Sequence, residues 1–286
     1  MPEIMLERPQ AKHAHELGRI CFEAFKDISE KHGFLSDFHS LDFAHSVISS
    51  SIANESNFSV AAILDGRPAG SNFMSLTDDV AGIGPVSVDP PAQGFGIGRR
   101  LMVAALEHAR ENGLDRVRLV QDAFNTTSMS LYASLGFDTT APLGMLEVRP
   151  AEHPDERIRP MAPDDINAAD AMCREMYKIS RRDGIARAPQ FGFTPLVLER
   201  DGRMRGYLVP GIIGHGVAET EEDMLALMAE GGRVMPFPVT QLLPLTEGNL
   251  FRKALAAGHR LRKMMNLMAL GAYEEPEGVW VPSVMY

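Results

Sequence analysis

The sequence predicts an α+β protein built from two related domains. Length, residue composition and a weakly conserved match between the two halves of the chain lead to this prediction. The chain has 286 residues, and at roughly 100–200 residues per domain this length favours two domains over one. Hydrophobic residues make up 45% of the chain and charged residues 23%. These fractions are ordinary for a globular protein and exclude a disordered, collagen-like or coiled-coil chain.

Two short segments of the first half return in the second half. C-F-E-A-F-K at residues 21–26 reappears as C-R-E-M-Y-K at 173–178, and D-G-R-P-A-G at 65–70 reappears as D-G-R-M-R-G at 201–206. The order is the same in both halves, while the offset between the copies becomes smaller along the chain. A second copy with shortened loops would have this property.

A third and fainter match completes the repeat. A-S-L-G-F at residues 133–137 corresponds to L-A-A-G-H at 255–259. We therefore predict two homologous units, residues 1–150 and 151–286, joined near the Pro- and charge-rich stretch Pro150–Glu156.

Hydrophobic spacing and turn signals predict the element order of the first unit. Apolar residues recur at helical spacing after residue 12, the D-G-R at 65–67 is a hairpin turn, and Gly113 and Gly136 are placed to end helices. The predicted elements are a strand over Ile4–Arg8, a helix over Lys12–His32, strands over Phe58–Leu64 and Pro68–Leu76, a strand ending at Val86–Val88, a helix over Arg99–Asn112, a strand over Arg116–Val120 and a helix over Thr126–Leu135.

Charge and apolar content exclude several classes of protein. With 28 basic and 38 acidic residues the net charge is −10, and no basic stripe exists, which argues against nucleic acid as the main partner. Apolar runs such as Leu101–Leu106 are far shorter than the roughly 18 residues that span a bilayer. Two cysteines cannot form a disulfide framework, and the first ten residues lack a secretory pattern, so we expect a cytoplasmic protein. The nine histidines show no metal-ligand spacing, so no metal is expected.

The most informative segment is V-S-V-D-P-P-A-Q-G-F-G-I-G-R-R-L-M at residues 86–102. A predicted strand enters a loop with three glycines, and the loop opens directly into a helix. Glycine lets backbone N–H groups converge on one point, and the helix adds unpaired donors and the positive end of its dipole. The pattern therefore predicts a turn that binds phosphate, and more specifically pyrophosphate.

Two common phosphate loops do not fit this spacing. No lysine follows the glycines, which excludes a Walker A loop. Arg99 stands where a dinucleotide fingerprint starting at Gly94 needs its last glycine. The remaining alternative is that the glycines only make a tight turn from strand to helix.

A second motif, N-x-x-S-x-x-L-Y-x-x-x-G-F, runs from Asn125 to Phe137 and places its polar residues on one helix face. Together, residues 86–102 and 125–137 closely resemble the GNAT superfamily of acetyl-coenzyme A-dependent N-acyltransferases. The resemblance extends more weakly over the whole first unit. It implies two GNAT-like α+β domains, each with a mixed, mostly antiparallel sheet that is splayed at the acetyl-CoA site and flanked by helices.

The resemblance also implies a role for each motif residue. Val86 and Val88 would offer backbone groups to the pantetheine arm, and Asn125 would hydrogen-bond the same arm. Tyr132 would act as general acid and protonate the departing thiolate, although a tyrosine packed in the core is the alternative. The pyrophosphate would be held by the backbone amides of seven consecutive residues, Gln93, Gly94, Phe95, Gly96, Ile97, Gly98 and Arg99.

One part of the family pattern is missing. Many members carry a glutamate on the strand before the glycine loop, where it deprotonates the amine. Here that strand reads V-A-G-I-G-P-V-S-V over residues 80–88 and has no carboxylate. Asp78 and Asp79 lie just upstream but are more simply turn residues, so the base stays unassigned.

The segment that lines the acceptor site in this family is rich in aromatic residues. Most of them should be core, but they could also enclose an apolar or ring-bearing acceptor. We expect a small-molecule amine, whose identity the sequence does not give. The aromatic residues are Phe22, Phe25, Phe34, Phe38, Phe43, His32 and His39.

The second unit is expected to be a degenerate copy. Its glycine loop should fall near residues 216–224, which read G-V-A-E-T-E-E-D-M. Four carboxylates there would repel a pyrophosphate, and Ala254 stands where Tyr132 stands in the first unit. The acidic run would instead suit a helix N-terminus, and residues 263–271 and 280–286 are expected to be terminal strands and packing.

Two functions agree with these patterns. The first is an acetyltransferase, monomeric or homodimeric, with one acetyl-CoA site in residues 1–150. The second is a non-catalytic module that senses acyl-CoA through the same loop. The absent strand carboxylate favours the second function, whereas Tyr132 favours the first.

Overall fold

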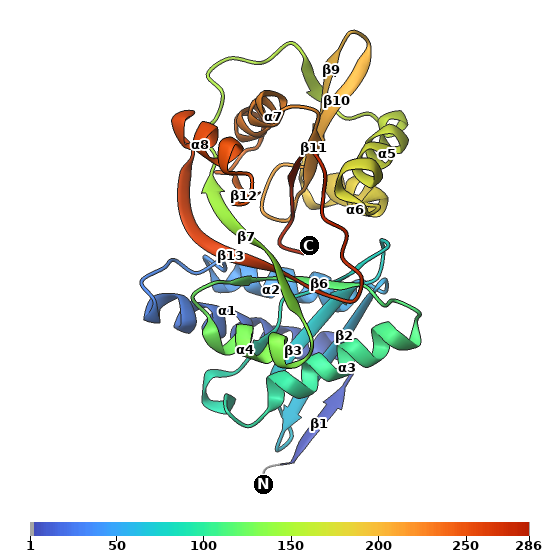
Figure 1. The fold of residues 1–286 in the computed structure, drawn as a ribbon. Coiled ribbons are helices and arrows are strands. Elements are labelled where there is room, and N and C mark those ends of the chain that lie inside the picture. The colour runs from blue at the N-terminus through green and yellow to red at the C-terminus, as the bar shows by residue number, and fades with distance from the viewer. Residues whose placement is uncertain (1–2, 286) are drawn as a thin grey trace. The chain divides into compact units, whose positions relative to one another are not determined.

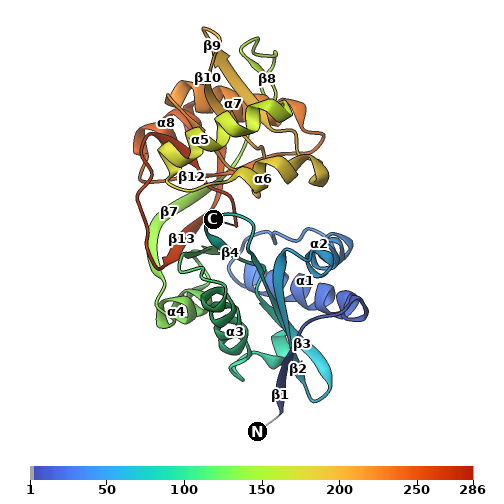
Figure 2. The same cartoon turned by 90° about the vertical axis from the view of Figure 1, so that its right-hand side faces the viewer.

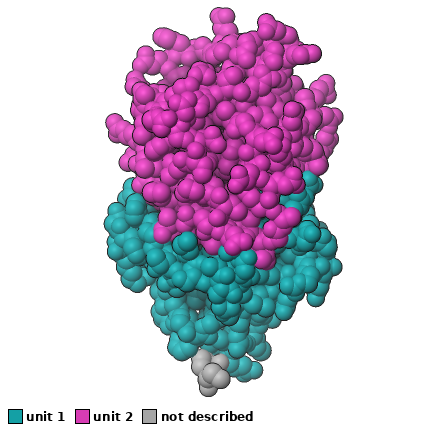
Figure 3. Space-filling view, in the orientation of Figure 1, with its two compact units in different colours: residues 1–118, 124–137 teal, residues 119–123, 138–286 magenta. Residues whose placement is uncertain are grey.

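The computed structural model describes residues 3–285, and internal contacts divide it into two compact units (Figure 3). Unit 1 comprises residues 1–118 and 124–137, and unit 2 comprises residues 119–123 and 138–286. This grouping follows contacts and not the sequence repeat, so the division at residue 150 remains a prediction.

In unit 1 a sheet has helices on both faces (Figures 1 and 2). Ala61 and Phe73 pack with Leu17 on the face covered by the first two helices, whereas Val60 packs with Leu101 on the other face. Neighbouring strand residues point to opposite faces, which explains the alternation. The elements are β1 (Ile4–Glu7), η1 (Ala11–His13), α1 (Ala14–Lys31), α2 (Leu41–Ala53), β2 (Asn57–Leu64), β3 (Arg67–Ser75), β4 (Ala81–Ile83), β5 (Ser87–Val88), η2 (Pro90–Ala92), α3 (Ile97–Glu111), α4 (Thr126–Ser134) and the first residues of β6 (Val117–Asp122).

Unit 2 has its own core, in which Leu196, Leu198 and Leu208 pack against Met224 and Leu227. Among residues 3–285, no helix combines the length and apolar content needed to cross a membrane. The elements of unit 2 are β7 (Asp138–Glu147), β8 (Ile158–Pro160), η3 (Pro163–Asp165), α5 (Ile166–Tyr177), α6 (Arg182–Arg187), η4 (Ala188–Phe191), β9 (Leu196–Arg200), β10 (Arg203–Leu208), β11 (Gly216–Ala218), α7 (Glu221–Val234), β12 (Thr240–Pro244), α8 (Gly248–Ala256), β13 (Arg260–Leu270) and β14 (Val279–Val281).

The strands of residues 3–285 form a nine-stranded and a five-stranded sheet. The first has the order β1-β2-β3-β4-β6-β13-β7-β12, with β5 beside β3, and the second has the order β14-β11-β10-β9-β8. β4 and β6 run parallel. The pairs β1–β2, β2–β3, β3–β4, β7–β12, β7–β13 and those of the five-stranded sheet are antiparallel. The predicted α+β class with mixed, mostly antiparallel strands is therefore confirmed.

The strand predicted to end at Val86–Val88 is interrupted. β4 ends at Ile83, the backbone turns through residues 84–86, and β5 resumes at Ser87. The N–H of Gly84 donates to the carbonyl of Phe73 at 2.9 Å and so continues the β3–β4 ladder by one pair. Pro85 follows and has no N–H to donate, which ends the strand. Val86 thus lies outside both strands, whereas Val88 lies in β5.

His215 is a titratable group inside unit 2, where it immediately precedes β11. It is 1% exposed, and its ring meets the Tyr207 ring edge-on with the centroids 5.6 Å apart. Burial lowers the pKa of the His215 imidazole well below its usual range, and the charge of Arg181 lowers it further. The folded chain therefore favours the neutral ring.

Replacing His215 with phenylalanine should reduce the loss of stability in acid. The unfolded chain binds a proton on this ring below its ordinary pKa of about 6.5, so stability is complete above that pH and declines below it. Between pH 7.5 and 5.5, His215 lowers the free energy of unfolding by at most about 1.4 kcal/mol, which corresponds to about 2–4 °C in Tm. Thermal denaturation at both pH values measures this. The exposed His153, changed to phenylalanine, is the control, and equal pH dependence of H215F and wild type would contradict the prediction.

Candidate functional site

β4 and β6 separate after two residue pairs, which leaves one edge of β5 open. Ala81 and Gly82 of β4 pair with Val117 and Arg118 of β6. After the turn, β5 pairs with β3 on one side. Within residues 3–285, no strand pairs with the other edge of β5. Its backbone groups can therefore accept an extended chain as an added strand.

The loop between β5 and α3 is open around two glycines in the left-handed region. Gly94 and Gly96 have φ angles of +86° and +79°, a conformation that disfavours other residues. A Cβ atom at either position would meet nothing within 4 Å. Phe95 between them is 52% exposed. The loop therefore keeps its backbone accessible.

The first turn of α3 presents backbone donors that have no acceptor in the helix. Its first helical hydrogen bond runs from the N–H of Arg100 to the carbonyl of Gly96, at 3.2 Å. The N–H groups of Ile97, Gly98 and Arg99 precede that bond, and no side chain caps the helix. Together with the positive end of the helix dipole, these groups form an anion-binding turn.

Side chains of the same loop hold it in place. The Gln93 side chain donates from Nε2 to the carbonyl of Val88 at 3.2 Å. Ile97 is 1% exposed, so its side chain is core and only its backbone can face a ligand. Arg99 donates from Nη2 to Ser134 Oγ at 2.5 Å. Three predicted site residues therefore also brace the turn.

α4 lies against the first turn of α3. A Cβ atom at Gly98 would be 3.4 Å from Leu131 Cδ2. Asn125 is the N-cap residue of α4, and its Oδ1 accepts the N–H of Ser128 at 3.1 Å. The Nδ2 amide is then the part of Asn125 that a ligand could use. The structure thus brings β5, the glycine turn and α4 together, as the two sequence motifs predict.

Tyr132 lies near the end of α4 and is 8% exposed. Burial raises the pKa of Tyr132 to about 12, so its hydroxyl stays protonated throughout the neutral range. Its ring lies beside that of Phe137, with the centroids 6.2 Å apart. This environment agrees with a proton donor and also with a packed core tyrosine, so both alternatives stand.

An aromatic stack lies directly before Asn125. Phe124 stacks on Phe34, with centroids 4.6 Å apart and planes 10° from parallel, and also on His32 at 5.2 Å. Sequence reasoning named Phe34 and His32 but missed Phe124, because one phenylalanine before a helix gives no periodic signal. The stack joins the segment after α1 to the start of α4.

No carboxylate lies on β4 or β5, so the general base stays unassigned. Asp89 follows β5 directly, but its Oδ1 lies 3.5 Å from Nη2 of Arg19. Asp79 lies in a bend before β4, where its carbonyl accepts a hydrogen bond from Arg116 at 3.3 Å.

A short connection, not a glycine loop, lies at residues 216–224, where the sequence repeat predicts the second loop. β11 passes to α7 through Glu219 and Thr220 only. The Thr220 hydroxyl accepts the N–H of Asp223 at 3.1 Å, so a side chain caps this helix where α3 has Gly96. The acidic run begins a helix, as predicted.

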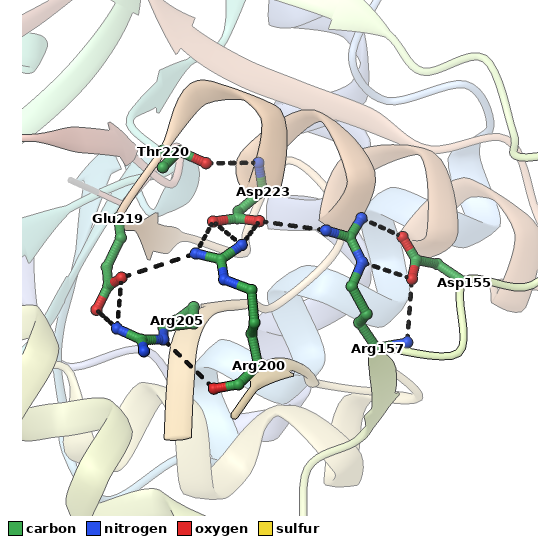
Figure 4. Close-up of polar contacts among 7 residues, drawn as sticks. All are labelled: Asp155, Arg157, Arg200, Arg205, Glu219, Thr220 and Asp223. Carbon is green, nitrogen blue, oxygen red and sulfur yellow. Dashed lines mark hydrogen bonds and ion pairs between the residues drawn. The ribbon is translucent and has the colours of Figure 1, made fainter. Parts of the chain in front are cut away.

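The acidic side chains at this connection are paired with arginines (Figure 4). Asp223, whose side chain is 2% exposed, lies 3.1 Å from Arg200 and 3.7 Å from Arg157. Glu219 pairs with Arg205 at 3.0 Å. These charges satisfy one another, whereas no side chain caps the first backbone donors of α3.

An open strand edge that leads into a turn with free backbone donors has the chemistry to accommodate a phosphate-bearing ligand with an extended arm. The profile of the "Acetyltransferase (GNAT) family" matches residues 19–137. The mycothiol acetyltransferase of Thermomonospora curvata is 43% identical over 74 residues, which are 26% of this chain and 25% of that protein. That of Thermobispora bispora is 52% identical over 52 residues, 18% of each chain. The chain therefore covers a quarter or less of these relatives.

Solved structures extend the likeness in fold to the whole chain. An acetyltransferase candidate from Pyrococcus horikoshii has a TM-score of 0.80 at 15% identity and covers 99% of this chain and 95% of its own. A GCN5-related N-acetyltransferase from Sphaerobacter thermophilus has a TM-score of 0.63 at 15% identity, covering 96% and 97%. Residues 19–137 are therefore similar to the GNAT acetyltransferase family, and the fold of the whole chain is similar to that of these two structures.

Replacing Gly96 with glutamate should weaken acetyl-CoA binding at least a hundredfold. The new side chain would enter the space in front of the free N–H groups, and its charge would repel phosphates. Gly113 is the matched control, because it lies at the other end of α3 with φ of +72° and nothing within 4 Å of a Cβ atom. G113E has the same backbone strain and should bind within threefold of wild type. Calorimetry compares them, and equal losses would show that strain, not the anion site, is responsible.

Proposed function

We propose that the chain is an N-acetyltransferase that moves the acetyl group of acetyl-CoA to a primary amine of a small-molecule acceptor. The observation that carries this proposal is the open edge of β5, which leads directly into the uncapped first turn of α3. A pantetheine arm can pair with the backbone around Val86 and Val88. The pyrophosphate then meets the amides of residues 93–99.

The chemistry requires three groups around the thioester. A neutral amine attacks the acetyl carbon, and a backbone N–H near Val88 donates to the oxyanion. The C–S bond breaks and the sulfur leaves as a thiolate that accepts a hydrogen bond from the Tyr132 hydroxyl, while the nitrogen, now part of the new amide, releases its proton to water. A pKa of about 12 against about 8.5 for a thiol makes complete transfer uphill by about 5 kcal/mol. Tyr132 therefore acts mainly by donating a hydrogen bond as the negative charge develops on sulfur.

A non-catalytic acyl-CoA-binding module is the second candidate. The observation that favours it is the absence of a carboxylate on β4 and β5. An amine that is already neutral needs no such base, so this absence does not exclude catalysis. Release of free coenzyme A with a panel of amines discriminates the two candidates, because a sensing module would give no release with any amine.

An aromatic stack beside α4 indicates the kind of acceptor that the site would suit. The Phe34–Phe124–His32 stack supplies apolar ring faces beside α4, which suits an acceptor with an apolar or ring-bearing part. The relatives are named for mycothiol, so their acceptor belongs in the amine screen. The two cysteines are free and buried, which agrees with a reducing cytoplasm.

The second half is proposed to be a degenerate copy of the first. The order β1-α1-α2-β2-β3-β4/β5-α3-β6-α4-β7 matches β8-α5-α6-β9-β10-β11-α7-β12-α8-β13, with β4 and β5 together in the place of β11. The matched helix ends support the alignment. Phe137 N–H donates to the carbonyl of Tyr132, and His259 N–H donates to that of Ala254, both at 3.1 Å. Ala254 therefore corresponds to Tyr132 and provides no acid.

Changing Tyr132 to phenylalanine should lower kcat about a hundredfold while KM for acetyl-CoA stays within threefold. The ring keeps its packing beside Phe137, and only the hydroxyl that faces the developing thiolate is lost. Steady-state kinetics with the best amine of the screen measures both constants. Changing Tyr177, a buried tyrosine of unit 2, to phenylalanine is the control. An unchanged kcat in Y132F would remove the acid role and leave acetyl transfer intact.

One coenzyme A should bind per chain, and Glu222→Ala should leave its affinity within threefold, about 0.65 kcal/mol. Glu222 pairs with Lys253 at 2.5 Å at the start of α7, where we place no ligand. Calorimetric titration gives both stoichiometry and affinity. A stoichiometry of two would overturn the proposal of a degenerate second copy.

A further inference from the structure

β11 of unit 2 has the same position in its hairpin sheet as β5 has in unit 1. Both hairpins turn on an Asp-Gly pair in which each residue has a positive φ. In unit 1 the φ angles are 49° at Asp65 and 79° at Gly66, and in unit 2 they are 55° at Asp201 and 69° at Gly202. The register then shifts by one residue at the same place in each hairpin, just before Gly70 in β3 and before Gly206 in β10.

The two glycines after these bulges fix the correspondence between β5 and β11. Gly70 pairs with Val88, and Gly206 pairs with Ala218. A Cβ atom at Gly70 would lie 2.6 Å from the carbonyl of Ser87, and one at Gly206 would lie 3.0 Å from the carbonyl of Val217. Each hairpin therefore needs glycine so that the next strand can approach closely. Val88 and Ala218 are equivalent positions.

The next residue repeats the match. The N–H of Asp89 donates to the carbonyl of Ala69 at 2.9 Å, and the N–H of Glu219 donates to the carbonyl of Arg205 at 2.8 Å. The edge of β11 that faces away from β10 therefore corresponds to the open edge of β5.

In unit 2 that edge is occupied by the C-terminal strand of the chain itself. β14 pairs with β11 in antiparallel register, Val281 with Gly216, Trp280 with Val217 and Val279 with Ala218. In unit 1 no strand takes the equivalent place among residues 3–285.

Further contacts seat the segment around β14. Trp280 stacks on Tyr177 with centroids 5.0 Å apart, and Val281 is fully buried. On either side, the N–H of Glu277 donates to the carbonyl of Met176 and the N–H of Val284 donates to the carbonyl of Ile212, both at 2.7 Å. These are backbone hydrogen bonds and buried apolar contacts, the means by which a sheet edge binds an extended peptide.

We propose that unit 2 keeps the cleft of the repeated fold as a groove for an extended apolar peptide, and that residues 277–285 are its ligand in cis. The proposal rests on the correspondence of β5 with β11 and not on acetyl transfer. The short connection at Glu219 and Thr220 removes the phosphate turn, and β14 takes the edge that remains. The groove therefore recognises backbone and valine and tryptophan side chains instead of a coenzyme.

The test separates this ligand from the chain without shortening the protein. The segment that leads to β14 is exposed at Ala272, Glu274 and Glu275, so a specific protease site inserted after Glu274 in the full chain can be cut after folding. The tail should stay bound through gel filtration. Trp280 is the single tryptophan, so its emission should keep the wavelength of a buried ring.

A labelled synthetic peptide of residues 275–286 should then exchange into the nicked protein. The same peptide with Val281→Lys should compete at least tenfold less well, because the lysine would be buried without a partner. The control peptide with Glu275→Lys, changed outside β14, should compete within threefold. Millimolar coenzyme A should not displace the tail.

Three results would overturn the proposal. They are loss of the tail while unit 2 stays folded, equal competition by the two variant peptides, and binding of a second coenzyme A after nicking. If nicking unfolds unit 2, excess peptide should restore the emission wavelength of a buried tryptophan ring. Failure to restore this wavelength also overturns the proposal. None of these measurements depends on acetyl transfer, so a failed acceptor screen would leave the result interpretable.

Discussion

The need of backbone N–H and C=O groups for partners governs both units of this protein. A strand edge in the interior of a fold needs hydrogen-bond partners, which another strand or a ligand can supply. In unit 1 the separation of β4 from β6 leaves β5 with an edge that no second strand pairs among residues 3–285. In unit 2 the same kind of edge, on β11, is completed by β14. The requirement for hydrogen-bond partners thus leaves the edge of β5 available to a ligand, whereas β14 of the same chain meets it at the edge of β11.

The helices that follow these two edges, α3 and α7, also differ in whether a side chain caps their first backbone donors. α3 begins at a glycine with no side-chain cap, so its donors remain available for an anion. α7 begins at Thr220, which caps the helix, and the Asp223 carboxylate next to it is held by Arg200 and Arg157. Satisfying the donors internally favours a stable helix start, whereas leaving them free favours binding.

Side chains hold the glycine turn of unit 1 in place, while its backbone faces outward. Gln93 bonds to Val88, Ile97 is buried, and Arg99 bonds to Ser134. Such bracing holds the donors in position before a ligand arrives, so little reorganisation is needed on binding. Gly94 and Gly96 supply the left-handed conformations that allow this geometry.

The sequence by itself determined what depends on local spacing. The helix over Lys12–His32, the Asp-Gly hairpins and the glycine turn were predictable, because helical period, positive-φ turns and strand-to-helix glycines act within a few residues. The two motifs also predicted that the turn and α4 belong to one site. Only the tertiary structure decided the stacking of Phe124 on Phe34 and the pairing of β14 with β11. Each of these is a contact between segments distant in sequence, and no local pattern encodes which backbone edge a distant strand will complete.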